Sequence, residues 1–254
     1  MSVPLTVVIP TLDEAAQIAQ CLAHLAWADE VVVADAGSRD ATVALARAAG
    51  AVVLEHSGPT IAAQRNAAIG RARNAWVFAL DADERFTDAL RDEVARTVAA
   101  PRHQAYQVRR QNVYLGRELT RGHWGRDWVT RLFPRDRRYV ERRVHEHLER
   151  LDDVGRLESL LLHEPYRDLT EQLDKMNRYA RWAAEDLHER GERATAWQLV
   201  GSPASRFLRA YVLQGSIADG RRGLVSSLLG GYTAFLKYAH LWALEHARRT
   251  DQRR

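Results

Sequence analysis

The stretch VFALDADERF, residues 77–86, runs from a predicted buried strand straight into three acids. Asp81, Asp83 and Glu84 lie so close together that their carboxylates repel one another and need positive charge nearby. Asp81 and Asp83 are two residues apart, so on an extended strand end both side chains face the same way. Paired carboxylates suit Mg²⁺ or Mn²⁺ shared with substrate phosphates. Acids that follow strands also serve as simple helix caps, so this alternative stays open.

Outward from this stretch, the first hundred residues alternate between apolar strands and helices. The predicted strands are 5–9, 30–38, 51–55 and 76–80, and the predicted helices are 14–25, 41–49, 61–73 and 88–99. Continuous apolar strands that alternate with helices predict a parallel sheet covered on both faces. We therefore expect an α/β fold of the doubly wound, Rossmann-like kind.

The remainder of the chain changes character twice. Residues 105–164 resemble strands and long loops, and the pattern is helical from Leu169 onward. We predict one α/β domain over 1–165 and a helical C-terminal extension over 166–254. The predicted breaks in the helical part are Gly191, Pro203 and Gly220–Gly223.

Cysteine content and hydropathy bound the cellular setting. Cys21 is the only cysteine of the 254 residues, which excludes internal disulfides and cysteine-built metal sites and suits a reducing cytoplasm. No stretch resembles a signal peptide, and none reaches the roughly 18 apolar residues of a membrane-spanning helix. We expect a cytoplasmic protein that is either free or peripheral on the inner face of the cytoplasmic membrane.

The charge is distributed unevenly. Residues 1–100 carry 8 Lys and Arg against 13 acids, whereas residues 101–143 carry 12 against 4. Individually, such arginines are ordinary solvated surface charges. As a block, they indicate an anionic partner such as a phosphorylated sugar, a lipid headgroup or a nucleic acid.

Polar residues cluster after the predicted strands, which is where an open parallel sheet binds its ligands. They are Pro10, Thr11, Asp13 and Glu14 after the first strand, Asp35, Gly37, Ser38 and Asp40 after the second, and Asp81, Asp83 and Glu84 after the fourth. No G-x-G-x-x-G follows the first strand and the chain has no G-x-x-x-x-G-K, which argues against dinucleotide and P-loop chemistry.

Four segments together resemble family 2 glycosyltransferases of the GT-A fold. They are IPTLDE (9–14), DAGSRDAT (35–42), QRNAAI (64–69) and ALDADE (79–84). The later RLFPRDRRYVERRVHEHL (131–148) and the helical end are similar to a bacterial subgroup near the lipopolysaccharide core glucosyltransferases. The resemblance implies a GT-A domain with a mostly parallel sheet, helices on both faces and a C-terminal helical extension.

The same resemblance implies an inverting, metal-dependent transfer. The expected donor is a nucleoside-diphosphate sugar, with a UDP-hexose as the first candidate, and the expected acceptor is a hydroxyl of an anionic or lipid-linked glycan such as lipopolysaccharide core. The expected cofactor is Mg²⁺ or Mn²⁺. The residues expected to bind the donor nucleotide are Pro10, Thr11, Asp13, Glu14, Asp35, Gly37, Ser38, Arg65, Asp81 and Ala82.

Several of these residues have plain structural alternatives. Asp35 either accepts a hydrogen bond from a uracil-like ring or stabilises its own turn. Arg65 either neutralises phosphate or makes an ion pair on a helix surface. The expected metal ligands are Asp81, Asp83 and His163, the last because GT-A enzymes often draw a ligand from beyond the sheet core. Packing in the core or in a loop is the alternative for His163.

Inverting displacement needs a base to take the proton of the acceptor hydroxyl. We expect Glu146, in RRVHEHL, to be that base, because it follows the basic block and lies in the segment that resembles the subgroup. Its alternative is an ion pair with the neighbouring arginines. Asp127, in WGRDW between two tryptophans, is the second candidate.

Beyond Pro203, apolar and aromatic residues recur at helical spacing between flanking basic residues. The apolar positions are Phe207, Tyr211, Leu224, Leu228, Tyr232, Phe235 and Trp242. Such helices lie in a bilayer interface or pack in a core or against a second subunit, and the sequence leaves the oligomeric state open.

Two other classes of protein remain as alternatives. A nucleotidyltransferase has related metal chemistry but normally carries a Gly-rich loop with Lys or Arg after the first strand, where this chain has PTLDEA. A non-catalytic basic binding module is the other alternative. We expect no nucleic-acid partner, because the chain lacks a nucleic-acid-binding signature and interleaved stacking aromatics.

Overall fold

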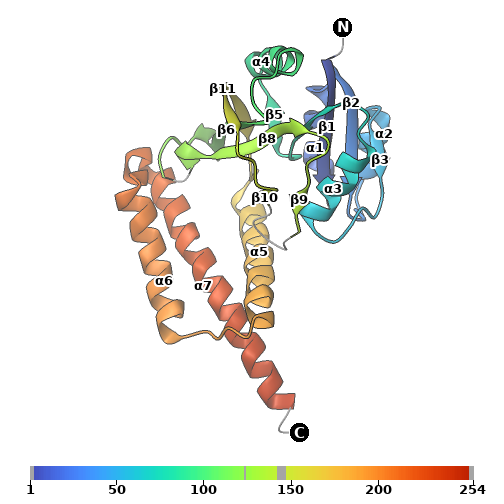
Figure 1. Cartoon of the computed structure of the whole chain (residues 1–254). Helices are drawn as coiled ribbons and strands as arrows, with labels where there is room; N and C mark the ends of the chain where they lie inside the picture. The colour runs from blue at the N-terminus through green and yellow to red at the C-terminus, as the bar shows by residue number, and fades with distance from the viewer. Residues whose placement is uncertain (1–2, 123, 142–146, 252–254) are drawn as a thin grey trace. The chain divides into compact units, whose positions relative to one another are not determined.

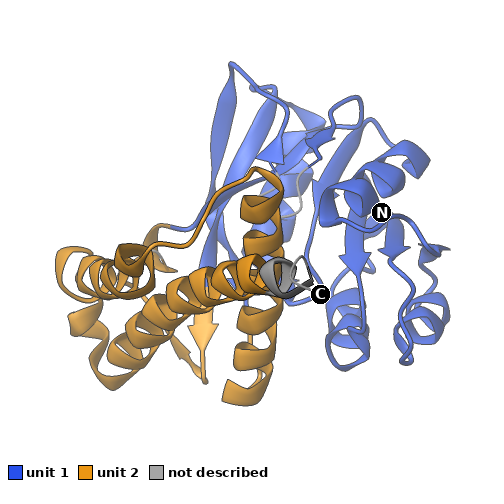
Figure 2. Cartoon of the chain, turned by 90° about the horizontal axis from the view of Figure 1, so that it is seen from below, with its two compact units in different colours: residues 1–111, 127–164 blue, residues 112–126, 165–254 orange. Residues whose placement is uncertain are grey.

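The computed structural model of the chain (Figure 1) describes residues 3–122, 124–141 and 147–251. It forms two compact units (Figure 2): unit 1 is Met1–Gln111 with Asp127–Glu164, and unit 2 is Asn112–Arg126 with Pro165–Arg254. Unit 2 thus includes a short segment that lies inside the predicted catalytic region. The functional division into two domains stays a prediction.

One half of the sheet in unit 1 is parallel. In spatial order its strands are β3 (Val52–Leu54), β2 (Ala28–Asp35), β1 (Val3–Thr11) and β4 (Trp76–Ala79). Val7 and Val8 of β1 point to opposite faces and both are fully buried. Burial on both faces explains why these strands are continuous apolar runs in the sequence.

Helices cover both faces of this parallel half (Figure 1): α1 (Ala15–Ala23), α2 (Thr42–Ala48), α3 (Ile61–Arg71) and α4 (Asp88–Ala99). One core cluster packs residues of α1, α2 and α4 against Val7, and the other packs α3 against Val8. Thr60 and Thr87 cap α3 and α4 by accepting backbone hydrogen bonds at 3.1 Å. The predicted helices are therefore present close to their expected bounds.

The other half of the sheet is antiparallel, so the sheet as a whole is mixed. It continues from β4 through β8 (Trp128–Pro134), β6 (Ala105–Tyr114), β11 (Val154–His163) and β5 (Glu84–Phe86). A separate pair is formed by β9 (Tyr139–Val140) and β10 (His147–Leu148). In the described parts of their connections, the strands beyond residue 100 are joined without crossover helices, and antiparallel pairing needs none.

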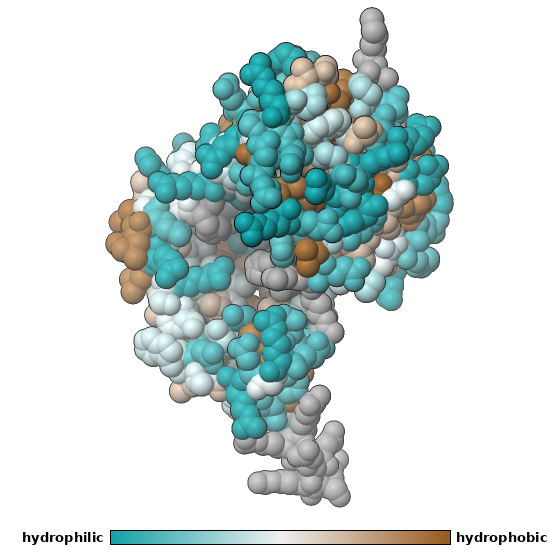
Figure 3. Space-filling model, in the orientation of Figure 1, coloured by the Kyte–Doolittle hydropathy of each residue, from teal (hydrophilic) through white to brown (hydrophobic). Residues whose placement is uncertain are grey.

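Unit 2 is built mainly from helices. Its elements are β7 (Arg117–Glu118), η1 (Trp124–Arg126), α5 (Leu169–Glu189), α6 (Ala196–Leu208), the π-helical turn η2 (Arg209–Leu213), η3 (Ser216–Asp219) and α7 (Gly220–Asp251). No helix in the described part of the chain combines the length and apolar character needed to cross a bilayer. Exposed apolar side chains gather as a brown patch near the end of α6 (Figure 3).

One predicted break in this unit is wrong, because Pro203 lies inside α6. The break predicted at Gly220–Gly223 is present at its first residue, since Gly220 ends η3 at φ +63° and α7 begins there. A Cβ added at Gly231 of α7 would lie 2.9 Å from the Pro203 carbonyl oxygen, so the two helices pack backbone to backbone. Close packing of this kind outweighs the hydrogen bond that a proline removes from a helix.

Candidate active site

The loops after β1 and β2 are joined at the carboxyl edge of the parallel strands. Thr11 and Asp35 are register partners at the ends of the two strands. The Asp13 N–H donates to Ser38 Oγ at 2.8 Å, and the Arg39 N–H donates to Asp13 Oδ1 at 2.8 Å. The two loops therefore hold each other, with the Asp13 backbone in the left-handed region at φ 56°.

The start of α1 extends this junction. The Glu14 N–H donates to Thr42 Oγ1 at 2.8 Å, and the Ala15 N–H donates to Asp40 Oδ2 at 3.0 Å. Burial raises the pKa of Asp40, but hydrogen bonds from Thr42 and Ala15 outweigh this and leave the pKa below its ordinary value. Pro10 lies one residue upstream of this junction, opposite Ala34 of β2.

Asp35 is buried and its carboxylate stabilises the turn that follows β2. Asp35 Oδ2 accepts from the backbone N–H groups of Gly37 at 2.7 Å and Ser38 at 2.8 Å, while Oδ1 accepts from Thr11 Oγ1 at 3.2 Å. The turn-stabilising alternative is thus what the structure shows, and the contact with a nucleotide base stays a prediction. Gly37 has φ +98°, and an added Cβ would lie 3.1 Å from His56 Nδ1.

Asp81 lies between two buried guanidiniums. Arg65 Nη2 pairs with Asp81 Oδ1 and Arg131 Nη2 pairs with Oδ2. Burial alone would raise the pKa of Asp81, but the charges of Arg131 and Arg65 hold it well below its usual range. Arg65 is 4% exposed, and its Cζ lies 4.8 Å from the centroid of the Tyr139 ring. The ion pair named as its alternative role is therefore present, but it is buried and does not lie on a helix surface.

Glu84 continues this network in the interior. It is fully buried, and its Oε1 accepts from Arg131 Nη2 at 2.6 Å and lies 3.5 Å from Arg110 Nη1. Its Oε2 accepts from the Asp81 N–H at 2.9 Å. Burial would lower the pKa of Arg131, but the carboxylates of Asp81 and Glu84 keep it well above its ordinary value.

The network also includes Asp127, the second candidate base. Arg110 holds both of its carboxylate oxygens, at 2.8 Å from Nε and 3.0 Å from Nη2. Charges thus alternate along what we call the ion-pair chain: Arg65, Asp81, Arg131, Glu84, Arg110 and Asp127. Glu146, the first candidate base, lies outside the described residues.

Asp83 faces a different partner from Asp81. The His163 Nε2 lies 3.7 Å from Asp83 Oδ1, and both side chains are mostly buried. The pairing of β5 with β11, in which His163 is opposite Glu84, places the histidine here. Asp81 and Asp83 do not lie on the extended strand end that the sequence predicts, because the Glu84 N–H donates to the Asp81 carbonyl at 3.0 Å and closes a turn. Ala82 lies buried in this turn.

The residues present fit a divalent ion in part. A carboxylate and an imidazole at 3.7 Å suit two neighbouring positions on one ion. Within the ranges that the structure describes, no group of three or more His, Cys, Asp or Glu side chains is placed to hold a metal. A Mg²⁺-like ion often takes one or two protein ligands and completes its shell with phosphate oxygens and water.

Sequence reasoning missed the buried partners of the acids. In the sequence, Arg110 belongs only to the basic block and Arg131 to that block and to the segment 131–148, and Glu84 belongs with Asp81 and Asp83 to the polar residues after the fourth strand. The repulsion among the three acids was the available signal, since it required positive charge close by. Arg131 carries that charge from β8, the antiparallel neighbour of β4.

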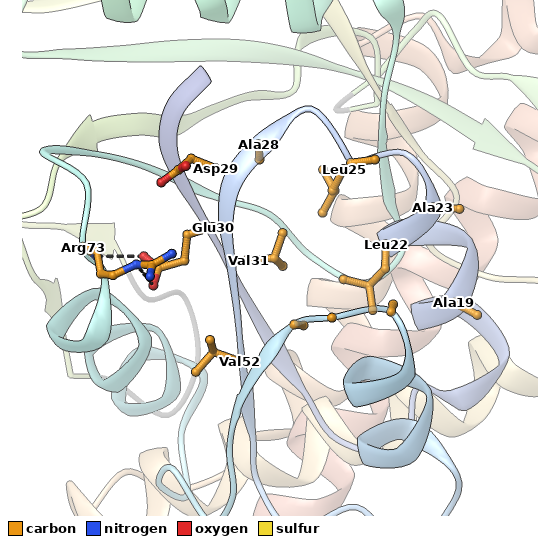
Figure 4. A pocket seen from close by; sticks show the side chains of 14 residues that line it. Ala19, Leu22, Ala23, Leu25, Ala28, Asp29, Glu30, Val31, Val52 and Arg73 are labelled. Carbon is orange, nitrogen blue, oxygen red and sulfur yellow. Dashed lines mark hydrogen bonds and ion pairs between the residues drawn. The ribbon is translucent and has the colours of Figure 1, made fainter. Parts of the chain in front are cut away.

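A cavity of about 460 Å³ lies elsewhere in unit 1 (Figure 4). It is lined by residues at the amino ends of β2 and β3, including Ala28 and Val52. Glu30 pairs with Arg73 Nε at 3.0 Å at its rim, as the dashed line in Figure 4 marks. Because the cavity is at the amino edge of the strands, it is separate from the polar loops at the carboxyl edge.

Comparison with protein families adds an independent finding. The family model "Glycosyl transferase family 2" matches residues 6–150. The chain is 30% identical over 248 residues to the lipopolysaccharide core biosynthesis glycosyltransferase LpsC of Rhizobium meliloti (strain 1021), covering 94% of this chain and 92% of that one. It is 26% identical over 247 residues to an uncharacterized glycosyltransferase of Rickettsia prowazekii (strain Madrid E), covering 92% and 85%.

Solved structures support the fold. The structure of S. aureus TarS 1–349 in complex with UDP matches with a TM-score of 0.50 and 13% identity, covering 99% of this chain and 92% of that chain. At this identity the match concerns the fold alone. Together with the family match, it confirms the expected GT-A fold, with helices on both faces of the sheet and a helical C-terminal extension. The sheet is mixed, whereas a mostly parallel one was expected.

Proposed function

Given that the chain belongs to glycosyltransferase family 2, we propose that it moves a sugar from a nucleoside-diphosphate donor to a hydroxyl of an anionic or lipid-linked glycan. A UDP-hexose is the proposed donor. The core region of lipopolysaccharide is the proposed acceptor, because the LpsC relative is named for that pathway. The observation that carries the proposal is the pair of buried guanidiniums, Arg65 and Arg131, held on Asp81 next to Asp83.

The donor side of the proposal uses the joined loops after β1 and β2. These loops, with Thr11, Asp13 and Ser38, would form the pocket for the base and ribose, and Asp35 would set the shape of its floor. Asp35 becomes a nucleotide contact only if a ligand displaces one of its present donors. Arg65 would face the diphosphate, since its charge is held at the end of β4 by Asp81.

The metal site is proposed at Asp83 and His163. When bound, a divalent ion supplies Lewis-acid stabilisation of the negative charge that develops on the leaving diphosphate. Of the three predicted ligands, Asp81 is the least suited to direct contact, because two arginines occupy its oxygens. We propose that Asp81 instead sets the positions of those arginines beside the leaving group.

The acceptor hydroxyl needs a base, and Glu146 and Asp127 are the two candidates. Transfer with inversion requires that a carboxylate take the proton of the attacking hydroxyl. The bidentate pair with Arg110 leaves Asp127 poorly placed for this task, so Glu146 is the proposed base. A contact of unit 2 with a membrane is also part of the proposal.

The test is nucleotide release from UDP-, GDP- and dTDP-sugars in the presence of Mg²⁺ or Mn²⁺, with and without a lipopolysaccharide-core acceptor. We expect release with one donor class and its loss in Asp83→Ala. Asp88→Ala is the matched control, because Asp88 is a highly exposed acid at the start of α4, and it should behave like the wild type. An Asp83→Ala enzyme with normal turnover would refute the metal site, and no release from any donor would refute the activity.

A further inference from the structure

The turn between α6 and α7 exposes a group of aliphatic side chains. Leu208, Val212, Leu213 and Ile217 are 54%, 56%, 81% and 57% exposed, and we call this group the tip. A side chain that is 81% exposed projects from the surface and does not line a groove. The brown patch near the end of α6 in Figure 3 belongs to this part of unit 2.

The local backbone explains why these residues point outward. The Gln214 N–H donates to the Arg209 carbonyl at 2.8 Å, a π-helical bond that inserts an extra residue into the last turn of α6. Gly215 then reverses the chain at φ +78°. Within the described stretch 208–217, burial is confined to the small residues Ala210 and Ser216. The large apolar residues are therefore left on the outside of the turn.

The hairpin formed by β6 and β7, with the residues that follow it up to Gly122, contacts the tip and the start of α7. The Gly122 N–H donates to the Gln214 carbonyl at 3.0 Å, and Arg222 Nη2 donates to the Leu115 carbonyl at 3.3 Å. The Asp219 carboxylate accepts from Thr120 Oγ1 at 3.2 Å and from the Arg121 N–H at 3.1 Å. The aliphatic residues are thus presented by a braced turn and not by a loose loop.

The surroundings of the tip are strongly basic. Residues 112–126 and 200–226 contain seven arginines and no lysine, against the two acids Glu118 and Asp219. Asp219 is already engaged by the hairpin. Arg209 and Arg221 are exposed and make no ion pair with any residue in the described ranges. The segments that contain or contact the tip therefore carry a net positive charge.

From these observations we infer that the tip inserts into the interfacial layer of an anionic lipid bilayer. Exposed apolar groups of this kind mark interaction sites, and a basic rim adds attraction to anionic headgroups. A protein partner fits less well, because interface cores favour aromatic anchors in packed pockets, whereas the tip is aliphatic and projecting. Of the apolar positions expected from the sequence, Phe207 and Tyr211 are neighbours of the tip in the chain, and the other five lie on α7. The inference rests on the four exposed aliphatic residues of the tip.

The test uses the full chain and sedimentation with vesicles of phosphatidylcholine, either alone or mixed with phosphatidylglycerol. We expect binding to the mixed vesicles that weakens with added salt. Val212→Gln/Leu213→Gln should weaken this binding by about tenfold or more, since each buried aliphatic side chain contributes substantially to transfer from water. Thermal unfolding should be unchanged, because both residues are exposed.

The matched control is Trp197→Gln/Val200→Gln at the other end of α6, where the two side chains are 75% and 73% exposed. This control should bind vesicles like the wild type. Equal loss in both variants, or no binding by the wild type at low salt, would overturn the inference. So would sedimentation velocity without lipid that shows a wild-type dimer and a monomeric tip variant, because the tip would then be a contact between copies of the chain.

Discussion

Glu84 Oε1 lies 2.6 Å from Arg131 Nη2, and the Glu84 side chain has no exposed surface. The third acid of the DADE segment is therefore an interior counter-charge and not a ligand for substrate or metal. It holds a guanidinium that also pairs with Asp81. A buried carboxylate thus fixes the position of Arg131, and through it that of Asp81.

Glu84→Gln tests how much the buried ion pairs of Glu84 contribute to stability. The substitution keeps the shape but removes the charge that faces Arg131 and Arg110, so the free energy of unfolding should fall by about 3–5 kcal/mol. Glu55→Gln is the control, because Glu55 pairs with Arg47 on the surface and should cost at most about 1 kcal/mol. Urea unfolding of both variants measures this, and equal losses would contradict the prediction.

Asp81→Asn tests the pH dependence of stability. Arg131 and Arg65 hold the pKa of Asp81 low in the folded protein, whereas the unfolded pKa is about 3.9. A depressed folded pKa contributes stability above the unfolded pKa, and this stability is lost as pH falls through the folded pKa. The free energy of unfolding of the wild type should exceed that of the variant most at neutral pH. This difference should become smaller below about pH 4. Urea unfolding of both proteins between pH 7 and low pH measures this difference. A difference that does not change with pH would contradict the prediction.

Glu146→Gln and Asp127→Asn separate the two candidate bases. Glu146→Gln should retain UDP binding but lower transfer by roughly 10²–10⁴-fold, because the amide cannot accept the proton. Asp127→Asn should mainly lower stability, since it breaks the bidentate pair with Arg110. Single-turnover transfer and UDP titration of both variants give the answer. Normal transfer by Glu146→Gln with collapse in Asp127→Asn would assign the role to Asp127.

Gly37→Ala tests the turn after β2. Its left-handed backbone costs a residue with a Cβ about 1–2 kcal/mol, and that atom would also press on His56 at 3.1 Å. Gly50→Ala is the control, because Gly50 has φ +83° but nothing within 4 Å of an added Cβ. Gly37→Ala should lose more stability and should alone weaken UDP binding in a calorimetric titration. Equal behaviour of the two variants would exclude a role of this turn in donor binding.

The parallel half of the fold was predictable because its signals are local. Apolar runs bounded by helix caps such as Thr60 and Thr87 indicate each element within a few residues. The short strand β5 was missed because Glu84–Phe86 begins on an acid and pairs only with the distant strand β11. Three residues are too few to show the alternating hydrophobic pattern of a strand, so this strand is defined only by its pairing with β11.

The site divides in the same way between local and distant contacts. Most side chains that join the loops after β1 and β2 are predictable from the sequence, because they follow strands that lie side by side; Thr42, which accepts from the Glu14 N–H, is the exception. The ion-pair chain was not, because Arg110 and Arg131 come from strands whose neighbours depend on antiparallel pairing. No spacing in the sequence links Arg131 to Asp81, which precedes it by fifty positions.

The ion-pair chain also constrains how such an enzyme can be recombined. The loop at Pro101 separates the parallel half from the later strands and would be a natural crossover point for chimeras that exchange acceptor specificity. A crossover there inherits Asp81 and Glu84 from one parent and Arg110 and Arg131 from the other. A chimera would pair each buried acid with an arginine only if both parents carry the same residues at these four positions. Parents that differ there can be recombined only if all four residues are taken from one of them.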